Sequence, residues 1–347
     1  MRFPLYGFAA VAVILGMGTI AVLGYLITPD NSAFANRMEV SQATQKPGFK
    51  AQYVHVKKDL AFPQTPWWKG MFFGYPVQDN EIPVEYAMQM GDSITYIDAA
   101  SGIESTKHKD ELQPFNGSYV DERTYHLGSD RYGRDLLSRL IIATRVSFII
   151  GFIAVGISLL IGLPLGLCAG YFGGWVDKVV MWLVNVVWSI PGLLLVIALT
   201  LALGKGIFQV FIAIGLTMWV EVARVVRGQV RSLRERAYVE VAQMMGFSAG
   251  RIMFRQILPG VLHPVIVISA ANFATAILLE SGLSFLGYGA QPPLPTWGGM
   301  VKDHWPYLLM GKPHLVLWPG GCILILVLAF MMFGNALRDL TDPRKNE

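Results

Sequence analysis

The sequence predicts an all-α, polytopic membrane protein with six transmembrane helices and a small, partly β, extracytoplasmic insertion between the first two. The 347-residue chain is 53% hydrophobic and only 15% charged, whereas a soluble domain usually carries about 25% charged residues. Six apolar runs reach or approach the roughly 20 residues that cross a bilayer. They cover residues 5–27, 146–176, 179–204, 206–220 with an extension to about 226, 256–279 and 313–337.

The first apolar run allows two interpretations. A secretory signal peptide has a basic cluster before its apolar run and a small-residue cleavage site after it. Neither is evident around residues 5–27, so we expect residues 1–28 to form a retained N-terminal transmembrane helix. The two cysteines, Cys168 and Cys322, lie inside apolar runs and predict no disulfide framework.

The distribution of charge predicts the orientation. Residues 29–140 carry 12 Lys and Arg against 15 Asp and Glu, and seven arginines lie between the fourth and fifth spans. Cytoplasmic loops carry the excess of Lys and Arg, which places the arginine-rich loop inside. With six spans, both termini then lie in the cytoplasm and residues 29–140 lie outside.

We expect residues 29–125 to form the extracytoplasmic domain. Its stretch SITYIDAASGIEST has the β-branched and aromatic content of a strand pair that turns near Ser101–Gly102. An aromatic cluster at Trp67, Trp68, Phe72, Phe73 and Tyr75 could be a docking surface, a packed core or a contact with the membrane interface.

Residues 126–347 are expected to form the transmembrane domain, and they begin with the motif HLGSDRYGRDLLSRL. Gly128 and Gly133 suit turns, and Asp135 lies where a carboxylate complements a helix N-terminus. We expect an interfacial helix that leads into the second span. The cluster could bind a metal or a substrate, or it could be a capped helix start with local ion pairs. Its residues are Gly128, Asp130, Gly133, Arg134 and Asp135.

Two regions suggest irregular backbone at membrane depth. Pro191 lies inside the third span, and a proline there usually kinks the helix. The segment 280–301 is rich in Gly and Pro, and either a pore-lining loop or an ordinary external loop explains it.

The arginine-rich loop, residues 227–260, predicts a helix, a glycine corner and a second helix. Leu233, Ala237, Val241 and Met245 recur every four residues as one apolar face, flanked by Tyr238 and Ala242. Gly246 suits the left-handed position that ends a helix. Ser248 can cap the next helix, which we expect to end at Pro259 after Leu258.

This loop could lie on lipid or in a groove of a partner protein. A helix flat on lipid explains the apolar face and the arginines. It leaves unexplained the acidic Glu240, on a surface that otherwise suits anionic headgroups, and the sharp corner at Gly246. A protein groove explains both.

The segment EVAQMMG followed by ILP resembles the cytoplasmic EAA loop of permease subunits of ABC importers. Glu240, Ala242, Gly246, Leu258 and Pro259 match that pattern, and Val241 replaces its middle alanine. The segments HLGSDRYGRDLLSRL, RVSF, GYFGGWVD and LRDLTDPR are similar to the dipeptide/oligopeptide permease group, in particular its C-type subunit. The resemblance covers residues 126–344.

The resemblance implies a type I ABC importer permease fold. It implies that this chain and a second permease form a path for di- or oligopeptides, or for a small solute such as a nickel chelate, across the bacterial inner membrane. Two cytoplasmic ATPases would supply the energy, and an extracytoplasmic binding protein would deliver the solute. The loop around Tyr238, Glu240 and Gly246 would dock on an ATPase as the coupling helix. Besides these proteins, only membrane lipid is expected as a partner, and no nucleic acid.

Other features of the sequence point to dependence on a separate energy source. No G-x-x-x-x-G-K-[ST] phosphate loop is present, and the central parts of the predicted spans carry no Asp, Glu, Lys, Arg or His that could bind a coupling ion. We expect no enzyme activity, no cofactor and no metal, with His304 and His314 at the polar surface. Two rival classes remain: a secondary transporter or channel would conduct solute alone in liposomes, and a membrane-anchored enzyme would need a catalytic constellation.

Overall fold

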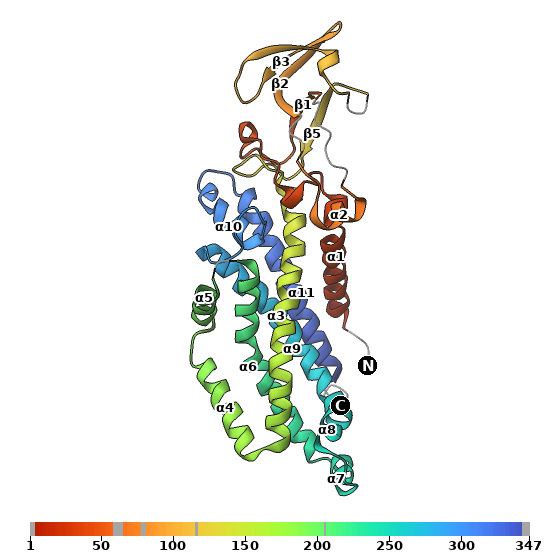
Figure 1. Cartoon of the computed structure of the whole chain (residues 1–347), viewed down its shortest axis with the longest axis vertical. Coiled ribbons are helices and arrows are strands. Elements are labelled where there is room, and N and C mark those ends of the chain that lie inside the picture. The colour runs from red at the N-terminus through yellow and green to blue at the C-terminus, as the bar shows by residue number, and fades with distance from the viewer. Residues whose placement is uncertain (1–3, 58–64, 78–80, 115–116, 205, 342–347) are drawn as a thin grey trace. The chain divides into compact units, whose positions relative to one another are not determined.

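The computed structural model describes residues 4–57, 65–77, 81–114, 117–204 and 206–341 (Figure 1). The chain divides into two compact units. Unit 1 contains Met1–Gly18, Val146–Gln291 and Gly321–Glu347, and unit 2 contains Thr19–Arg145 and Pro292–Gly320. The domain boundaries expected after residues 28 and 125 stay predictions.

The described residues contain five helices that are long and apolar enough to cross a membrane, or six if one bent pair is counted as a single span. The bent pair corresponds to the third predicted span. The five are α1 (Leu5–Ile27), α3 (Leu136–Phe172), α6 (Ile207–Arg234), the continuous helical segment Ala249–Leu286 that ends in α9 (Leu258–Leu286), and α11 (His314–Thr341).

The bent pair consists of α4 (Gly174–Trp188) and α5 (Gly192–Leu203), which meet at an angle of 91°. Pro191 lies at the break, directly before α5. Because proline has no amide hydrogen and disfavours helical backbone in the residue before it, α4 ends at Trp188. The kink expected at Pro191 is therefore a complete break of the helix.

The helix expected to lead into the second span is continuous with it, because α3 is a single helix of 37 residues. Asp135 caps its first turn, and between this cap and the membrane-spanning part no residue interrupts the backbone hydrogen bonds. Helix α3 is therefore about 55 Å long at 1.5 Å per residue.

Within unit 1, α3 and α6 approach closely along a row of glycines. A Cβ on Gly162, Gly166 or Gly170 would lie 2.5–2.9 Å from backbone oxygens of α6, and also against side chains of α6. Small residues at every fourth position let two membrane helices pack with their backbones nearly in contact. The carbonyl oxygens that these three glycines face belong to Trp219, Ala223 and Arg227.

Aromatic packing fixes another part of unit 1. The rings of Phe273 (α9) and Phe330 (α11) stack with centroids 3.8 Å apart, and Phe148 and Phe152 of α3 meet Phe273 edge-on. Such packing supplies dispersion contacts within a bilayer, where the hydrophobic effect does not drive helices together. The spans α3, α9 and α11 therefore share one core.

Unit 2 contains an antiparallel five-stranded sheet with strand order β4-β3-β2-β1-β5. The strand pair predicted around Ser101–Gly102 is confirmed as β3 and β4, with Gly102 at a φ of +68° in the turn. Tyr53, Ile94 and Tyr96 are buried in the sheet. The strands are β1 (Phe49–His55), β2 (Glu81–Met90), β3 (Ser93–Asp98), β4 (Glu104–His108) and β5 (Val120–Tyr125).

Two short helices complete unit 2. Helix α10 (Trp297–His304) buries Trp297, whose indole nitrogen donates to the Leu140 carbonyl at 3.2 Å. Helix α2 (Trp67–Phe73) has the sequence WWKGMFF, and four of its aromatic side chains are exposed. Core packing, one of the three explanations offered for this aromatic cluster, is therefore wrong for Trp67, Trp68, Phe72 and Phe73.

Candidate functional site

The loop between α6 and α9 carries a short helix, α7 (Ala237–Met244), with two different apolar faces. One face, with Val239 and Ala242, is buried in a cluster that includes Val226, Ile252 and Ile257. The opposite face is exposed and consists of Tyr238, Val241, Met244 and Met245. Helix α7 therefore presents an apolar surface that nothing in the described part of the chain covers.

The apolar row expected from Leu233 to Met245 is not one helical face. Leu233 belongs to α6, which ends at Arg234, and two residues separate it from α7. Their backbone turns the chain, because Arg236 is extended with a ψ of 140°. Of the four residues in the predicted row, Ala237, Val241 and Met245 are exposed and Leu233 is half-buried.

Gly246 forms the corner after α7, as predicted. Its φ is +74°, in the left-handed region that residues with a Cβ rarely adopt. The Phe247 amide donates to the Ala242 carbonyl at 3.2 Å, and the Gly246 amide donates to the Gln243 carbonyl at 3.0 Å. This pair of bonds is the Schellman motif, which fixes the direction in which the chain leaves α7.

The next helix begins as predicted and ends differently. The Ser248 side chain caps α8 (Ala249–Ile252) by accepting from the Arg251 amide. The expected stop at Pro259 is wrong, because a π-helical segment, Met253–Ile257, leads directly into α9, with Pro259 in its first turn. The wider π turn accommodates the proline ring, and the first turn of a helix needs no amide donor there.

The loop residues predicted to dock on a partner differ in solvent exposure in the structure. Ala242 is buried and Leu258 is half-buried against the same cluster. Ile257, next to Leu258, is fully buried. The exposed members are Tyr238, Glu240, Val241, Gly246 and Pro259.

An open, polar cavity lies beside Glu240. Glu240 and Gln243 line it from α7, Arg231 and Arg234 from α6, and the glycine turn before α4 forms its other wall. Asp177 on α4 binds Arg227 on α6 through two hydrogen bonds, the one from Nη2 to Oδ2 being 2.6 Å long. The side chain of Glu240 is exposed beside this cavity.

In unit 2, the first part of the motif, residues 126–135, forms a tight turn before α3. Arg134 Nε binds Asp130 Oδ2 at 2.6 Å, and Arg139 Nε lies 3.6 Å from the same oxygen. Gly128 and Gly133 both have positive φ. A Cβ on Gly133 would lie 1.8 Å from the Glu39 carbonyl oxygen, so the turn requires glycine there.

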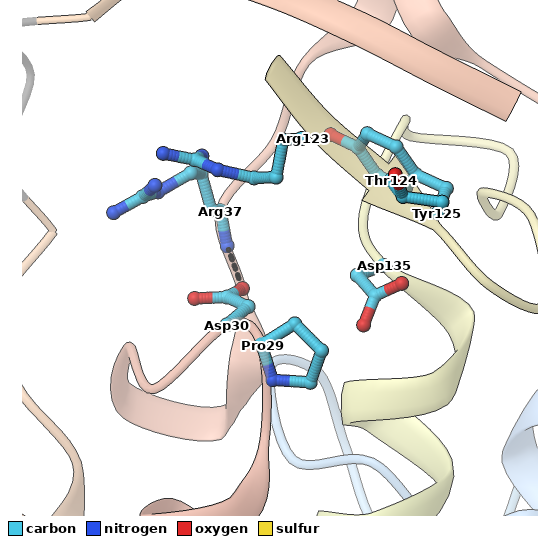
Figure 2. A pocket seen from close by; sticks show the side chains of 7 residues that line it. All are labelled: Pro29, Asp30, Arg37, Arg123, Thr124, Tyr125 and Asp135. Carbon is cyan, nitrogen blue, oxygen red and sulfur yellow. Dashed lines mark hydrogen bonds between the residues drawn. The ribbon is translucent and has the colours of Figure 1, made fainter. Parts of the chain in front are cut away.

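Asp135 ends this turn and caps α3. Its Oδ2 accepts from the Ser138 amide at 2.8 Å, whereas Oδ1 has no hydrogen-bond partner among the described residues. Burial raises the pKa of this carboxyl group. Figure 2 shows Asp135 and Asp30 on either side of Pro29, where they line a small pocket.

The two positively charged side chains that line the pocket in Figure 2 are already paired with a carboxylate. Its two arginines, Arg37 and Arg123, both bind Glu81 at 2.9 Å. No group of three or more His, Cys, Asp or Glu side chains suited to a metal occurs within the described ranges. The arrangement agrees best with a capped helix start held by local ion pairs.

His304 is not at the surface, where it was expected. It is buried, with Nδ1 2.7 Å from the Met300 carbonyl and Nε2 accepting from the Arg131 amide at 3.4 Å. Burial lowers the pKa of its imidazole. Because α10 folds back on the turn of residues 126–135, His304 becomes part of the packing of unit 2.

Two functional candidates were not identified from the sequence. Met244 is the most exposed residue of the α7 surface, and its spacing of three residues from Val241 could have indicated it. Arg145 donates to four backbone carbonyls, those of Ala21, Val22, Met71 and Phe72. Arg145 is the first residue of the segment RVSF, but the resemblance of that segment does not indicate a side chain whose acceptors are all backbone atoms.

Comparisons with known proteins show the family to which the chain belongs. Residues 162–347 match the family described as binding-protein-dependent transport system inner membrane component. The glutathione transport system permease protein GsiD of Pectobacterium atrosepticum is 38% identical over 218 residues, which cover 63% of this chain and 72% of that protein. The dipeptide transport system permease protein DppC of Alkalihalophilus pseudofirmus is 39% identical over 234 residues, which cover 67% and 77%.

Two further similarities extend the comparison. The oligopeptide transport system permease protein OppC of Bacillus subtilis is 36% identical over 229 residues, which cover 66% of this chain and 75% of that protein. Among solved structures, an inward-facing conformation of the MetNI methionine ABC transporter aligns with a TM-score of 0.48 at 20% identity. That alignment covers 60% of this chain and 97% of the solved chain.

Proposed function

Because the chain belongs to the family of binding-protein-dependent transport system inner membrane components, we propose that it forms, with a second permease, the path by which an ATP-driven importer carries peptides across the membrane. The chain itself is a transport subunit and not an enzyme, since ATP hydrolysis in these importers belongs to a separate subunit. The absence of a phosphate loop from the sequence agrees with this division.

The exposed apolar face of α7 is the observation that carries the proposal. Tyr238, Val241 and Met245 form a surface on a helix whose other face is packed, so α7 is held rigidly while it offers contacts to a partner. Glu240 adds an acidic group at the edge of that surface. A cytoplasmic ATPase with an apolar groove and a basic residue fits this chemistry, and its movement on ATP binding would displace α7.

The remaining partners follow from the proposed path. Two ATPase subunits would bind α7 of this chain and the corresponding helix of the second permease. An extracytoplasmic solute-binding protein would deliver the solute on the side of unit 2. The N- and C-termini and α7 would then lie in the cytoplasm.

The solute is proposed from the relatives. Their names assign them glutathione, dipeptides and oligopeptides, which share a peptide backbone. We extend this class of solute, and no individual peptide, to the present chain.

The test is reconstitution of the chain with the second permease, the ATPases and the binding protein in proteoliposomes. ATP-dependent uptake of labelled di- and oligopeptides is expected, and the isolated chain should neither hydrolyse ATP nor conduct peptide. Conduction by the chain alone would contradict the proposal in favour of a channel or secondary transporter.

The coupling surface is tested by introducing a charge. Val241→Asp should abolish uptake and co-purification with the ATPase, because it places a carboxylate in the apolar contact. Ser232→Asp adds the same charge to an exposed position on the last turns of α6 and should leave both nearly unchanged. Equal behaviour of the two variants would remove α7 from the ATPase contact.

A further inference from the structure

Helix α2 has an unusual surface for a short helix outside the membrane spans. Its side chains Trp67 and Phe73 are 72% and 70% exposed, and Trp68 and Phe72 are also exposed. The only charged residue of α2 is Lys69, whose Nζ lies 5.4 Å from the centroid of the Trp68 ring. An apolar aromatic surface with a single cation is unsuited to water.

The backbone of α2 is fixed to the C-terminal end of α1. Arg145 donates from Nε to the Ala21 carbonyl at 2.7 Å and from Nη2 to the Val22 carbonyl at 2.6 Å. The same guanidinium donates from Nη1 to the Phe72 carbonyl at 2.9 Å and from Nη2 to the Met71 carbonyl at 3.2 Å. One side chain therefore joins the last turns of α1 to the last turn of α2.

A second set of contacts fixes the same position. The chain leaves α2 at Gly74, where a Cβ would lie 2.8 Å from both Ala33 and Tyr25. Tyr75 then exchanges backbone hydrogen bonds with the segment after α1, donating to the Asn31 carbonyl at 2.9 Å and accepting from the Ala33 amide at 3.0 Å. Figure 1 shows α2 beside that end of α1.

These contacts place α2 at the boundary of the bilayer. Helix α1 has 23 residues, which at 1.5 Å each span about 34 Å, close to the roughly 30 Å of the hydrocarbon core. Its last residue, Ile27, therefore lies at the interface, and Ala21 lies about 9 Å below it along the axis. A guanidinium that reaches both Ala21 and Phe72 puts α2 within the headgroup layer.

We propose that α2 is an interfacial anchor, in which Trp67, Trp68, Phe72 and Phe73 insert among the phospholipid headgroups beside α1. Tryptophan is enriched at this depth because its ring combines an apolar body with a polar N–H group. Lys69 is then positioned to meet lipid phosphates. Arg145 is the positioning residue, because it sets the depth of α2 relative to the span.

The proposal is tested with spin labels in the full-length chain. After replacement of Cys168 and Cys322 by alanine, a nitroxide is attached at Trp67→Cys or Phe73→Cys. These side chains are mostly exposed, so the substitutions should not disturb folding. The control is Glu104→Cys, at an exposed position on β4 of the same unit.

The labelled chains are reconstituted into vesicles of phosphatidylcholine and phosphatidylglycerol, alone and in the assembled importer. Accessibility to oxygen, which concentrates in lipid, is compared with accessibility to a water-soluble nickel chelate. Labels at Trp67 and Phe73 should favour oxygen in both preparations, and the label at Glu104 should favour the chelate. The proposal fails if all three labels behave alike, or if α2 is shielded from both reagents in the assembled importer, since a protein partner would then cover it.

The role of Arg145 has its own measurement. Arg145→Gln should make the label at Trp67 more mobile and shift its accessibility towards the chelate, because α2 loses its bonds to the guanidinium. Unchanged mobility and depth in this variant would show that Arg145 does not position α2.

Discussion

Val239 is fully buried and Val241, two residues further along α7, is 53% exposed. A helix of eight residues with apolar side chains on both faces needs a second surface to cover the outer one, because isolated exposed side chains are common but a contiguous apolar face is not. Headgroups of the membrane and the groove of an ATPase are the two surfaces available to this loop, and they predict different responses to mutation.

The backbone conformation of Gly246 provides a test that distinguishes the membrane surface from the ATPase groove. A residue with a Cβ in the left-handed region costs roughly 1–2 kcal/mol, although a Cβ on Gly246 would meet nothing within 4 Å inside this chain. Gly246→Val should therefore leave membrane insertion normal, abolish uptake and reduce ATPase co-purification. Gly250→Val is the matched control, because Gly250 has the same open space without a positive φ. Normal uptake by Gly246→Val would favour a loop that lies on lipid.

Glu240 provides a test of charge. Glu240→Lys should weaken ATPase binding if the carboxylate meets a basic residue of the partner. Glu235→Lys reverses another exposed acid that lines the same polar cavity and should have little effect. On a lipid surface both substitutions would be neutral or favourable, so similar uptake by the two variants would contradict the groove. Co-purification and transport assays measure both.

The orientation of the chain is tested by fusions. A reporter that is active only outside the cytoplasm should be active after Pro114, in unit 2, and inactive after Arg231, near the end of α6. The reason is the excess of arginine around α7, which cytoplasmic loops retain. A cytoplasmic Pro114 would overturn the six-span arrangement.

Gly133 should be sensitive to the smallest substitution. Gly133→Ala and Gly102→Ala both place a Cβ at a positive φ, but only Gly133 faces a neighbouring backbone, the Glu39 carbonyl, whereas Gly102 has open space. Overpacking adds about 1–3 kcal/mol, so Gly133→Ala should lower the melting temperature of the detergent-solubilised protein clearly more than Gly102→Ala. Equal effects would mean that the turn of residues 126–134 relaxes around a methyl group.

Acid should destabilise unit 2 partly through His304. Burial lowers the pKa of its imidazole below 6.5, so the unfolded chain binds the proton more readily, and the stability that neutral His304 contributes is lost as the pH falls below about 6.5. One such group changes the free energy of unfolding by at most about 1.4 kcal/mol per pH unit. Melting temperatures between about pH 7 and pH 5 should fall less for His304→Gln than for the parent, while His108→Gln, at an exposed position, should match the parent.

Features set by local chemistry could be predicted from the sequence. The lengths of the apolar runs located the spans, and family membership confirms the fold class of a type I ABC importer permease. Gly246 and Ser248 located the corner after α7, because a left-handed residue and a cap are properties of single residues. The same holds for Gly128 and Gly133 in the turn before α3.

Features set by packing could not be predicted. Pro259 taken alone predicts the end of a helix. In the structure a π turn precedes it and the helix continues through it. His304 belongs to a polar segment, yet α10 buries it against residues 126–140, more than 150 positions away in the chain. The exposure of α2 is also a tertiary property, since the pattern WWKGMFF fits a core and an interface equally well.

The row of glycines between α3 and α6 has a mechanical consequence. Where Gly162, Gly166 and Gly170 face α6, no side chain on α3 separates the two backbones, so no rotamer can change to take up a displacement. Only Glu235 and Arg236 separate α6 from α7. A displacement of α7 is therefore transmitted almost completely to the membrane-spanning part of unit 1. Helices α3 and α6 must then move together as one rigid body.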